Sequence, residues 1–91
     1  MKFAIRVPAC FLYPAITSPW EAAASPADMV RFARHAEALG FDWLWLSEHI
    51  IQIPQLVPTM GARFYEAVTA AALLAGATSR IKLLTYVAVL P

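Results

Sequence analysis

The sequence predicts an α/β fold, the N-terminal β-α-β-α-β portion of a (β/α)8 barrel with parallel strands. Three apolar runs alternate with two helical stretches, and such alternation is typical of parallel sheets joined by right-handed crossovers. The middle run, residues 43–47, has no clean polar alternation, as expected of a parallel strand. The three glycines, Gly40, Gly61 and Gly76, form neither a dinucleotide-binding fingerprint nor a P-loop. A barrel-type start therefore remains.

The first strand and the first helix follow from local signals. Residues 2–9 form a short apolar run that ends near Pro8, and a proline-rich loop follows. Ser25 is a good N-cap, Pro26 suits the first helical position, and Gly40 provides a C-terminal stop, so a helix is expected over residues 26–39. The residues expected to face the core are Met29, Val30, Phe32, Ala33, Ala36 and Leu39.

The second half of the chain predicts a strand, a helix and a strand. Residues 43–47 are expected to be covered on both faces, with Trp43 and Trp45 packing inside the fold. After a loop with two prolines, residues 64–78 form an Ala-rich helix with almost no polar face, which predicts burial all round. Residues 81–90, rich in Val and Leu, predict the third strand.

The composition indicates one domain, residues 1–91, that needs further apolar contacts. It is 60% hydrophobic and 14% charged, against averages of about 45 to 50% and about 25% for soluble domains. A complete barrel takes about 250 residues, so the chain corresponds to about three of eight β/α units. We expect its apolar surface to be buried against the rest of a larger fold, a partner subunit, or both.

Charge and hydropathy exclude several classes of partner. Seven Lys and Arg against six Asp and Glu give a net charge of +1, with no basic run for nucleic acid. No apolar stretch approaches the roughly 20 residues of a membrane span, and prolines interrupt any signal-peptide core. A cytoplasmic protein is therefore expected, and the single Cys10 fits a reducing compartment. No metal site is expected.

The catalytic candidates are Glu48 and His49, directly after the second strand, where α/β folds carry their chemistry. His49 can donate or accept a proton near neutral pH, and its alternative is a hydrogen-bonded structural histidine. Glu48 either orients a substrate or His49, or is a loop carboxylate paired with an arginine. Cys10 either touches a ligand or is a small buried residue. His35 and Glu37 are expected to form a polar cluster at the surface or between helices.

Several stretches carry a family resemblance in their order and spacing. They are Met1-Lys2-Phe3-Ala4, Ala36-Glu37-Ala38-Leu39-Gly40-Phe41-Asp42, Trp45-Leu46-Ser47-Glu48-His49-Ile50, Leu73-Leu74-Ala75-Gly76-Ala77-Thr78-Ser79-Arg80-Ile81 and Thr85-Tyr86-Val87-Ala88-Val89-Leu90-Pro91. With these the chain resembles the N-terminal part of the luciferase-like flavin and deazaflavin oxidoreductases, a family of (β/α)8 (TIM) barrels that includes monooxygenases. The resemblance implies hydride transfer to or from a small-molecule substrate.

The resemblance also implies a coenzyme site. It puts His49 beside the coenzyme ring and Thr85, Tyr86 and Val87 in the wall behind it, although a strand end of this composition is core by default. It further implies a cis peptide bond at Tyr86–Val87. The Ser-Glu-His-Ile pattern at residues 47–50 favours the deazaflavin coenzyme F420, with FMN as the alternative.

Two further expectations concern assembly. In relatives the helix over residues 64–78 helps to form a subunit interface, which predicts a homo-oligomer, and an intramolecular core is the alternative. Barrels usually bind phosphate with loops after strands seven and eight, so coenzyme affinity of the 91-residue chain is expected to be poor. The alternative function is a non-catalytic, truncated barrel fragment that acts as a structural or self-associating module.

Overall fold

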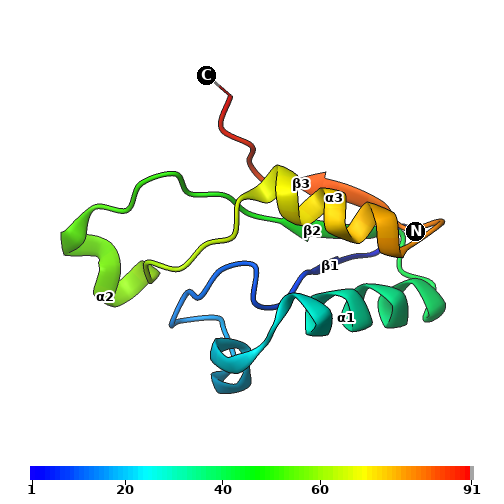
Figure 1. Cartoon of the computed structure of the whole chain (residues 1–91), viewed down its shortest axis with the longest axis horizontal. Coiled ribbons are helices and arrows are strands. Elements are labelled where there is room, and N and C mark those ends of the chain that lie inside the picture. Colours follow the sequence, from blue (N-terminus) through cyan, green and yellow to red (C-terminus); the bar gives the residue numbers. More distant parts are fainter. Residues whose placement is uncertain (91) are drawn as a thin grey trace.

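The computed structural model describes residues 1–90 and contains one sheet of three parallel strands (Figure 1). The strands lie in the order β1 (Ala4–Arg6), β2 (Trp43–Leu46) and β3 (Lys82–Thr85). In the central strand, Leu44 pairs with Ile5 on one side and with Leu83 on the other. The predicted α/β fold with parallel strands is thus confirmed. Pro91, the last residue of the matching stretches, lies outside the described residues.

Helix α1 (Pro26–Ala38) begins where the sequence signals predict and ends one residue before the predicted end, with Leu39 as its C-cap. The Ser25 side chain accepts a hydrogen bond from the backbone N–H of Asp28, and the Asp28 carboxylate accepts one from the N–H of Ser25. This reciprocal capping box satisfies two N–H groups that the first turn leaves free. Gly40 follows the helix with a φ of 90°, in the left-handed region that glycine adopts without a Cβ penalty.

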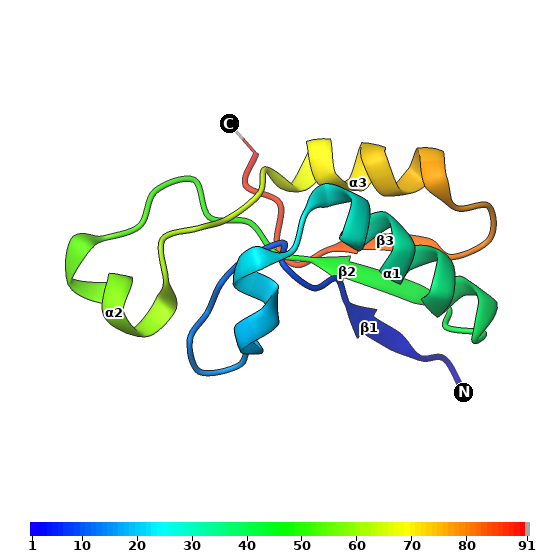
Figure 2. The same cartoon turned by 60° about the horizontal axis from the view of Figure 1, so that its bottom comes forward.

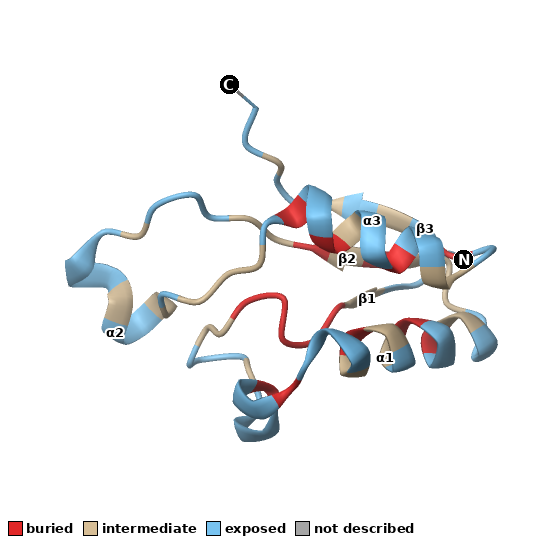
Figure 3. Cartoon of the chain, viewed as in Figure 1, coloured by how far each residue is buried: buried red, intermediate tan, exposed pale blue. Residues whose placement is uncertain are grey.

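The core lies between the sheet and its helices (Figure 3). Leu44 and Leu46 of β2 are fully buried under this helical layer. The core positions expected on α1 are confirmed as buried for Met29, Ala33 and Ala36, and Val30 and Phe32 are partly buried. The expectation is wrong for Leu39, which is 65% exposed because it follows the last helical turn at the edge of the layer.

Helix α3 (Ala67–Ala77) is shorter than the predicted range 64–78. It begins at Ala67 because Glu66 acts as its N-cap, accepting hydrogen bonds from the N–H groups of Val68 and Thr69. The sequence predicted that this helix is buried on all sides. That prediction is wrong for the chain by itself, since only one side of α3 contacts the sheet and α1. The buried residues are Ala67, Ala70 and Leu74, whereas Val68 is 62% and Leu73 43% exposed.

Helices α1 and α3 lie side by side on the same face of the sheet (Figure 2). The Arg34 side chain donates a hydrogen bond of 3.0 Å to the carbonyl of Ala77. The Glu37 carboxylate accepts hydrogen bonds from the N–H groups of Arg80 and Ile81, which hold its pKa at about 2. The predicted polar cluster therefore involves Glu37, while His35 is exposed.

The opposite face of the sheet differs from expectation. It is not fully covered, since Trp43 and Trp45 of β2 are only half-buried. A charged side chain also lies on this face, since the Lys82 Nζ atom is 5.2 Å from the centre of the Trp43 ring in a cation–π contact. The strands are also shorter than the apolar runs. The chain leaves β1 after Arg6 and β3 after Thr85, so the residues that follow belong to loops.

Both long loops contain short helical turns that the sequence analysis did not predict. They are η1 (Pro19–Ala23), η2 (Pro54–Leu56) and α2 (Val57–Met60). Figure 1 shows α2 standing away from the sheet, on the side where the strands end. Over residues 1–90, no helix combines the length and apolar character that a membrane crossing demands.

Candidate functional site

An open hollow of about 510 Å³ lies where the carboxyl ends of β2 and β3 meet. Ligand pockets are commonly about 300 to 1,000 Å³, and barrels and open α/β sheets bind ligands at this edge. Its walls come from the segments directly after β2 and β3. The lining residues are Ser47, Glu48, His49, Ile50, Ile51, Tyr86, Val87 and Val89.

The hollow brings together most of the residues singled out in the sequence. Glu48 and His49 line it from β2, and Tyr86 and Val87 line it from β3. The peptide bond between Tyr86 and Val87 is cis, as the resemblance implied. Thr85 does not line the hollow. It pairs in register with the buried Leu46, so both side chains lie on the helix-covered side of the sheet.

His49 presents an exposed imidazole at the rim of this hollow. Its ring centre lies 4.7 Å from that of Phe64, with the two rings tilted by 49°. One side of the imidazole is thus held by an aromatic ring while the ring remains accessible to solvent and to a ligand. An imidazole so placed can exchange a proton with a molecule in the hollow.

Glu48 ties the walls of the hollow to each other. One carboxylate oxygen accepts a hydrogen bond of 3.4 Å from the N–H of Ala67, at the start of α3, and the other accepts one of 2.7 Å from the N–H of Val89. Within residues 1–90 no arginine pairs with it. The side chain therefore holds the loop after β3 and the first turn of α3 against the end of β2.

An ion pair that the sequence did not predict lies beside β1. The Arg6 guanidinium donates two hydrogen bonds, of 2.9 and 2.7 Å, to the carboxylate of Glu21, which is 1% exposed. Burial acts to raise the pKa of Glu21, but hydrogen bonds from Arg6 and two backbone N–H groups outweigh it and lower the pKa to about 2. The capping-box spacing between Ser18 and Glu21 was the available signal.

Of the two roles considered for Cys10, ligand contact or a small buried residue, the structure favours the second. It is buried, its thiol donates a 3.0 Å hydrogen bond to the carbonyl of Val7, and burial raises its pKa. In the part of the chain that the structure describes, no group of three or more His, Cys, Asp and Glu side chains could hold a metal ion.

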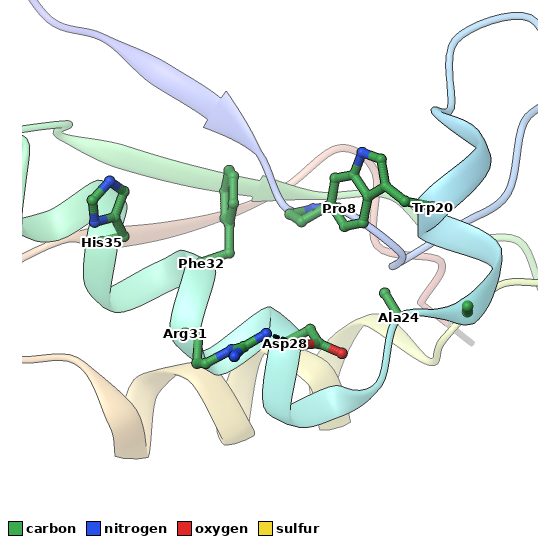
Figure 4. A pocket seen from close by; sticks show the side chains of 8 residues that line it. Pro8, Trp20, Ala24, Asp28, Arg31, Phe32 and His35 are labelled. Carbon is green, nitrogen blue, oxygen red and sulfur yellow. Dashed lines mark hydrogen bonds and ion pairs between the residues drawn. The ribbon is translucent and has the colours of Figure 1, made fainter.

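A second hollow lies between η1 and α1, also of about 510 Å³ (Figure 4). Trp20, Phe32 and His35 line it, and Figure 4 shows the ion pair of Asp28 with Arg31 at its border. It contains none of the predicted site residues, and its two opposite charges are already paired. The hollow at the ends of β2 and β3 is therefore the better candidate site.

A comparison with models of known protein families gives a match that covers the whole sequence. Residues 1–91 match the family model described as luciferase-like monooxygenase. No curated protein and no solved structure matches the chain.

Proposed function

The chain belongs to the luciferase-like monooxygenase family, and we propose that it is the N-terminal part of an oxidoreductase that transfers hydride to or from a small molecule. Members of this family typically depend on a flavin or on the deazaflavin coenzyme F420. In the proposal, β1, β2 and β3 are the first three of the eight strands of a TIM barrel. The enzyme works in the cytoplasm.

One observation carries the proposal: candidate residues from two neighbouring strands line a single hollow at the carboxyl edge of the sheet. Glu48 and His49 come from one strand, and Tyr86 and Val87 come from the other. Active sites of barrel enzymes are built in this way, from the ends of several strands at the same edge.

The residues of the hollow fit the ring of a flavin or deazaflavin better than its phosphate. Ile50, Ile51 and Val87 offer apolar contact, while Ser47 and His49 offer hydrogen bonds. No Lys or Arg is among the lining residues, so a coenzyme phosphate has no cation there. We therefore expect weak binding. The isoleucine directly after His49 supports F420 as the coenzyme, with FMN as the alternative.

His49 has the central chemical role in this proposal. A bound coenzyme supplies the hydride chemistry, and the protein positions it. The imidazole of His49 delivers or removes the proton that accompanies reduction or oxidation of the substrate at an oxygen or nitrogen atom. Glu48 keeps the hollow in shape through its hydrogen bonds to the N–H groups of Ala67 and Val89.

The test is a fluorescence titration of the purified chain with F420 and, separately, with FMN. An Ile51→Asp variant should weaken binding about tenfold, or about 1.4 kcal/mol, because it places a carboxylate on an apolar wall of the hollow beside an anionic ligand. Leu39→Glu is the matched control, since Leu39 is also an exposed apolar residue but lies outside this hollow. Equal weakening in both variants would contradict binding at this hollow.

A second candidate function is a non-catalytic module that self-associates through α3. Exposed Val68 and Leu73 favour it, together with a hollow of about 440 Å³ between α1 and α3 that Met29, Ala70 and Leu73 help to line. Binding of neither coenzyme, with assembly retained, would favour this module over the enzyme. A homo-oligomer is compatible with both functions.

A further inference from the structure

The Glu21 carboxylate connects three segments of the chain. Besides its two hydrogen bonds from Arg6 of β1, it accepts one of 2.8 Å from the N–H of Ala9 and one of 2.9 Å from the N–H of Ser18. Ala9 has a φ of 62°, a left-handed conformation that is uncommon for a residue with a Cβ atom. The bond to Glu21 thus stabilises the sharp turn that leads from β1 into the next residues.

This turn places the ring of Phe11 under the Arg6 side chain. The central guanidinium carbon of Arg6 lies 5.2 Å from the centre of the Phe11 ring, a cation–π contact. Phe11 is only 4% exposed. Its position is therefore set on one side by a cation that Glu21 holds in place.

The Phe11 ring in turn stacks on Phe64, with ring centres 5.9 Å apart and planes inclined by 19°. Backbone hydrogen bonds flank the stacked rings, since Leu12 donates to Arg63 and Tyr65 donates to Cys10. The loop after β1 and the loop before α3 are thus joined where their aromatic rings meet.

Phe64 completes the path, because it is the ring that contacts the His49 imidazole at 4.7 Å. Contacts between neighbouring groups therefore run from Glu21 through Arg6, Phe11 and Phe64 to His49. His49 lies on the exposed rim of its hollow. Its contact with the Phe64 ring restricts the positions that the imidazole can take. Phe11 is buried and Phe64 is half-buried, so a displacement of the Phe11 ring is passed to Phe64 with little free volume to absorb it.

We propose that the pair formed by buried Glu21 and partly buried Arg6, acting through the Phe11 and Phe64 rings, positions the His49 imidazole at the hollow. Glu21 is then a positioning residue, although it lies outside the hollow itself. The importance of this position for turnover rests on the proposed function, whereas the position itself can be measured without any coenzyme.

The experiment uses aromatic NMR spectra of the full chain, in which His49 and His35 are the two histidines. In the wild type, the ring protons of His49 should show a ring-current shift and a cross-relaxation signal to Phe64. Two variants disturb the pair: Glu21→Gln, and Arg6→Met with Glu21→Leu, which removes both charges of the pair. Phe11→Leu leaves the pair intact and removes the stacked ring.

Each folded variant should lose the His49–Phe64 signal and move the His49 shifts toward those of free histidine, with His35 unchanged. Circular dichroism establishes whether each variant folds. If Glu21→Gln does not fold, the spectrum of the double variant tests the role of the pair. An undiminished His49–Phe64 signal in a folded pair variant or in Phe11→Leu would overturn the proposal. Unchanged turnover in a His49→Ala variant would instead refute the proposed function.

Discussion

His49 provides the most direct residue-scale test of the enzymatic proposal. Replacing it with alanine should lower the rate at which a quinone such as menadione oxidises the reduced coenzyme by about 10²-fold or more. Coenzyme affinity should fall much less than the rate, because Ser47 and the apolar wall residues Ile51 and Val87 remain. His35→Ala is the matched control, since His35 lies on α1 and lines the other hollow. Full activity of His49→Ala would remove the imidazole from the mechanism.

Glu21 gives a residue-scale prediction about pH. Its pKa is about 2 in the folded chain, below the ordinary value of 4.5. The ionised carboxylate therefore stabilises the folded chain more than the protonated form does. The stabilisation is fully present above about pH 4.5 and is lost as the pH falls toward about 2. Urea unfolding of Glu21→Gln should therefore differ most from the wild type near pH 7, and the difference should narrow toward pH 3. A difference that does not change with pH would contradict this assignment.

At the same scale, the sequence singled out His49 and Glu48 as candidates because both follow an apolar strand directly, and the structure places both at the hollow. It did not identify Glu21, whose burial depends on Arg6 fifteen residues earlier in the chain. The pairing of Glu48 with backbone N–H groups was equally out of reach, because Ala67 and Val89 approach it only in the folded chain. Local patterns therefore indicate candidate residues at strand ends but not which distant groups meet them in the fold.

At the scale of the elements, replacement of a glycine by alanine should have opposite effects on stability at two positions. A Cβ atom on Gly61, after α2, would lie 1.7 Å from the carbonyl oxygen of Leu12, and Gly61 has a φ of 73°. Gly61→Ala should therefore destabilise the contact between the loop after α2 and the loop after β1. Gly76 in α3 has no atom within 4 Å of such a Cβ, so Gly76→Ala should stabilise the chain by about 0.5 to 1 kcal/mol.

Thermal unfolding of the two glycine variants checks both signs in one experiment. If Gly61→Ala melted at or above the wild-type temperature, the close approach of Gly61 to Leu12 would be contradicted. A lower melting temperature of Gly76→Ala would mean that the outer side of α3 is less open than the structure shows.

The elements differ in how far the sequence predicted them. Helix α1 was predicted almost to the residue because Ser25, Pro26 and Gly40 are strong local signals at its ends. The start of α3 was missed because Glu66 is an unusual N-cap. The third strand ends at Thr85 although apolar residues continue, since hydrophobicity does not reveal where a chain leaves the hydrogen bonds of a sheet.

At the scale of the whole molecule, the chain exposes more surface than its size requires. Its accessible surface is 5868 Å², whereas a compact protein of 10.0 kDa is expected to expose about 5,200 Å². Large apolar side chains contribute on the outer side of α3, where Val68 and Leu73 are exposed. The high apolar content of the sequence therefore agrees with burial of this outer side of α3 against another protein surface.

We expect the chain to self-associate through α3, and Val68→Glu should weaken that association at least tenfold. Burying an unpaired carboxylate in an apolar interface is unfavourable, whereas an acidic residue in the first turn of a helix is compatible with folding. Leu39→Glu is the control, because Leu39 is about as exposed but lies at the end of α1. Sedimentation velocity over a range of concentrations measures the effect. A wild-type chain that remained monomeric at high concentration would contradict the interface.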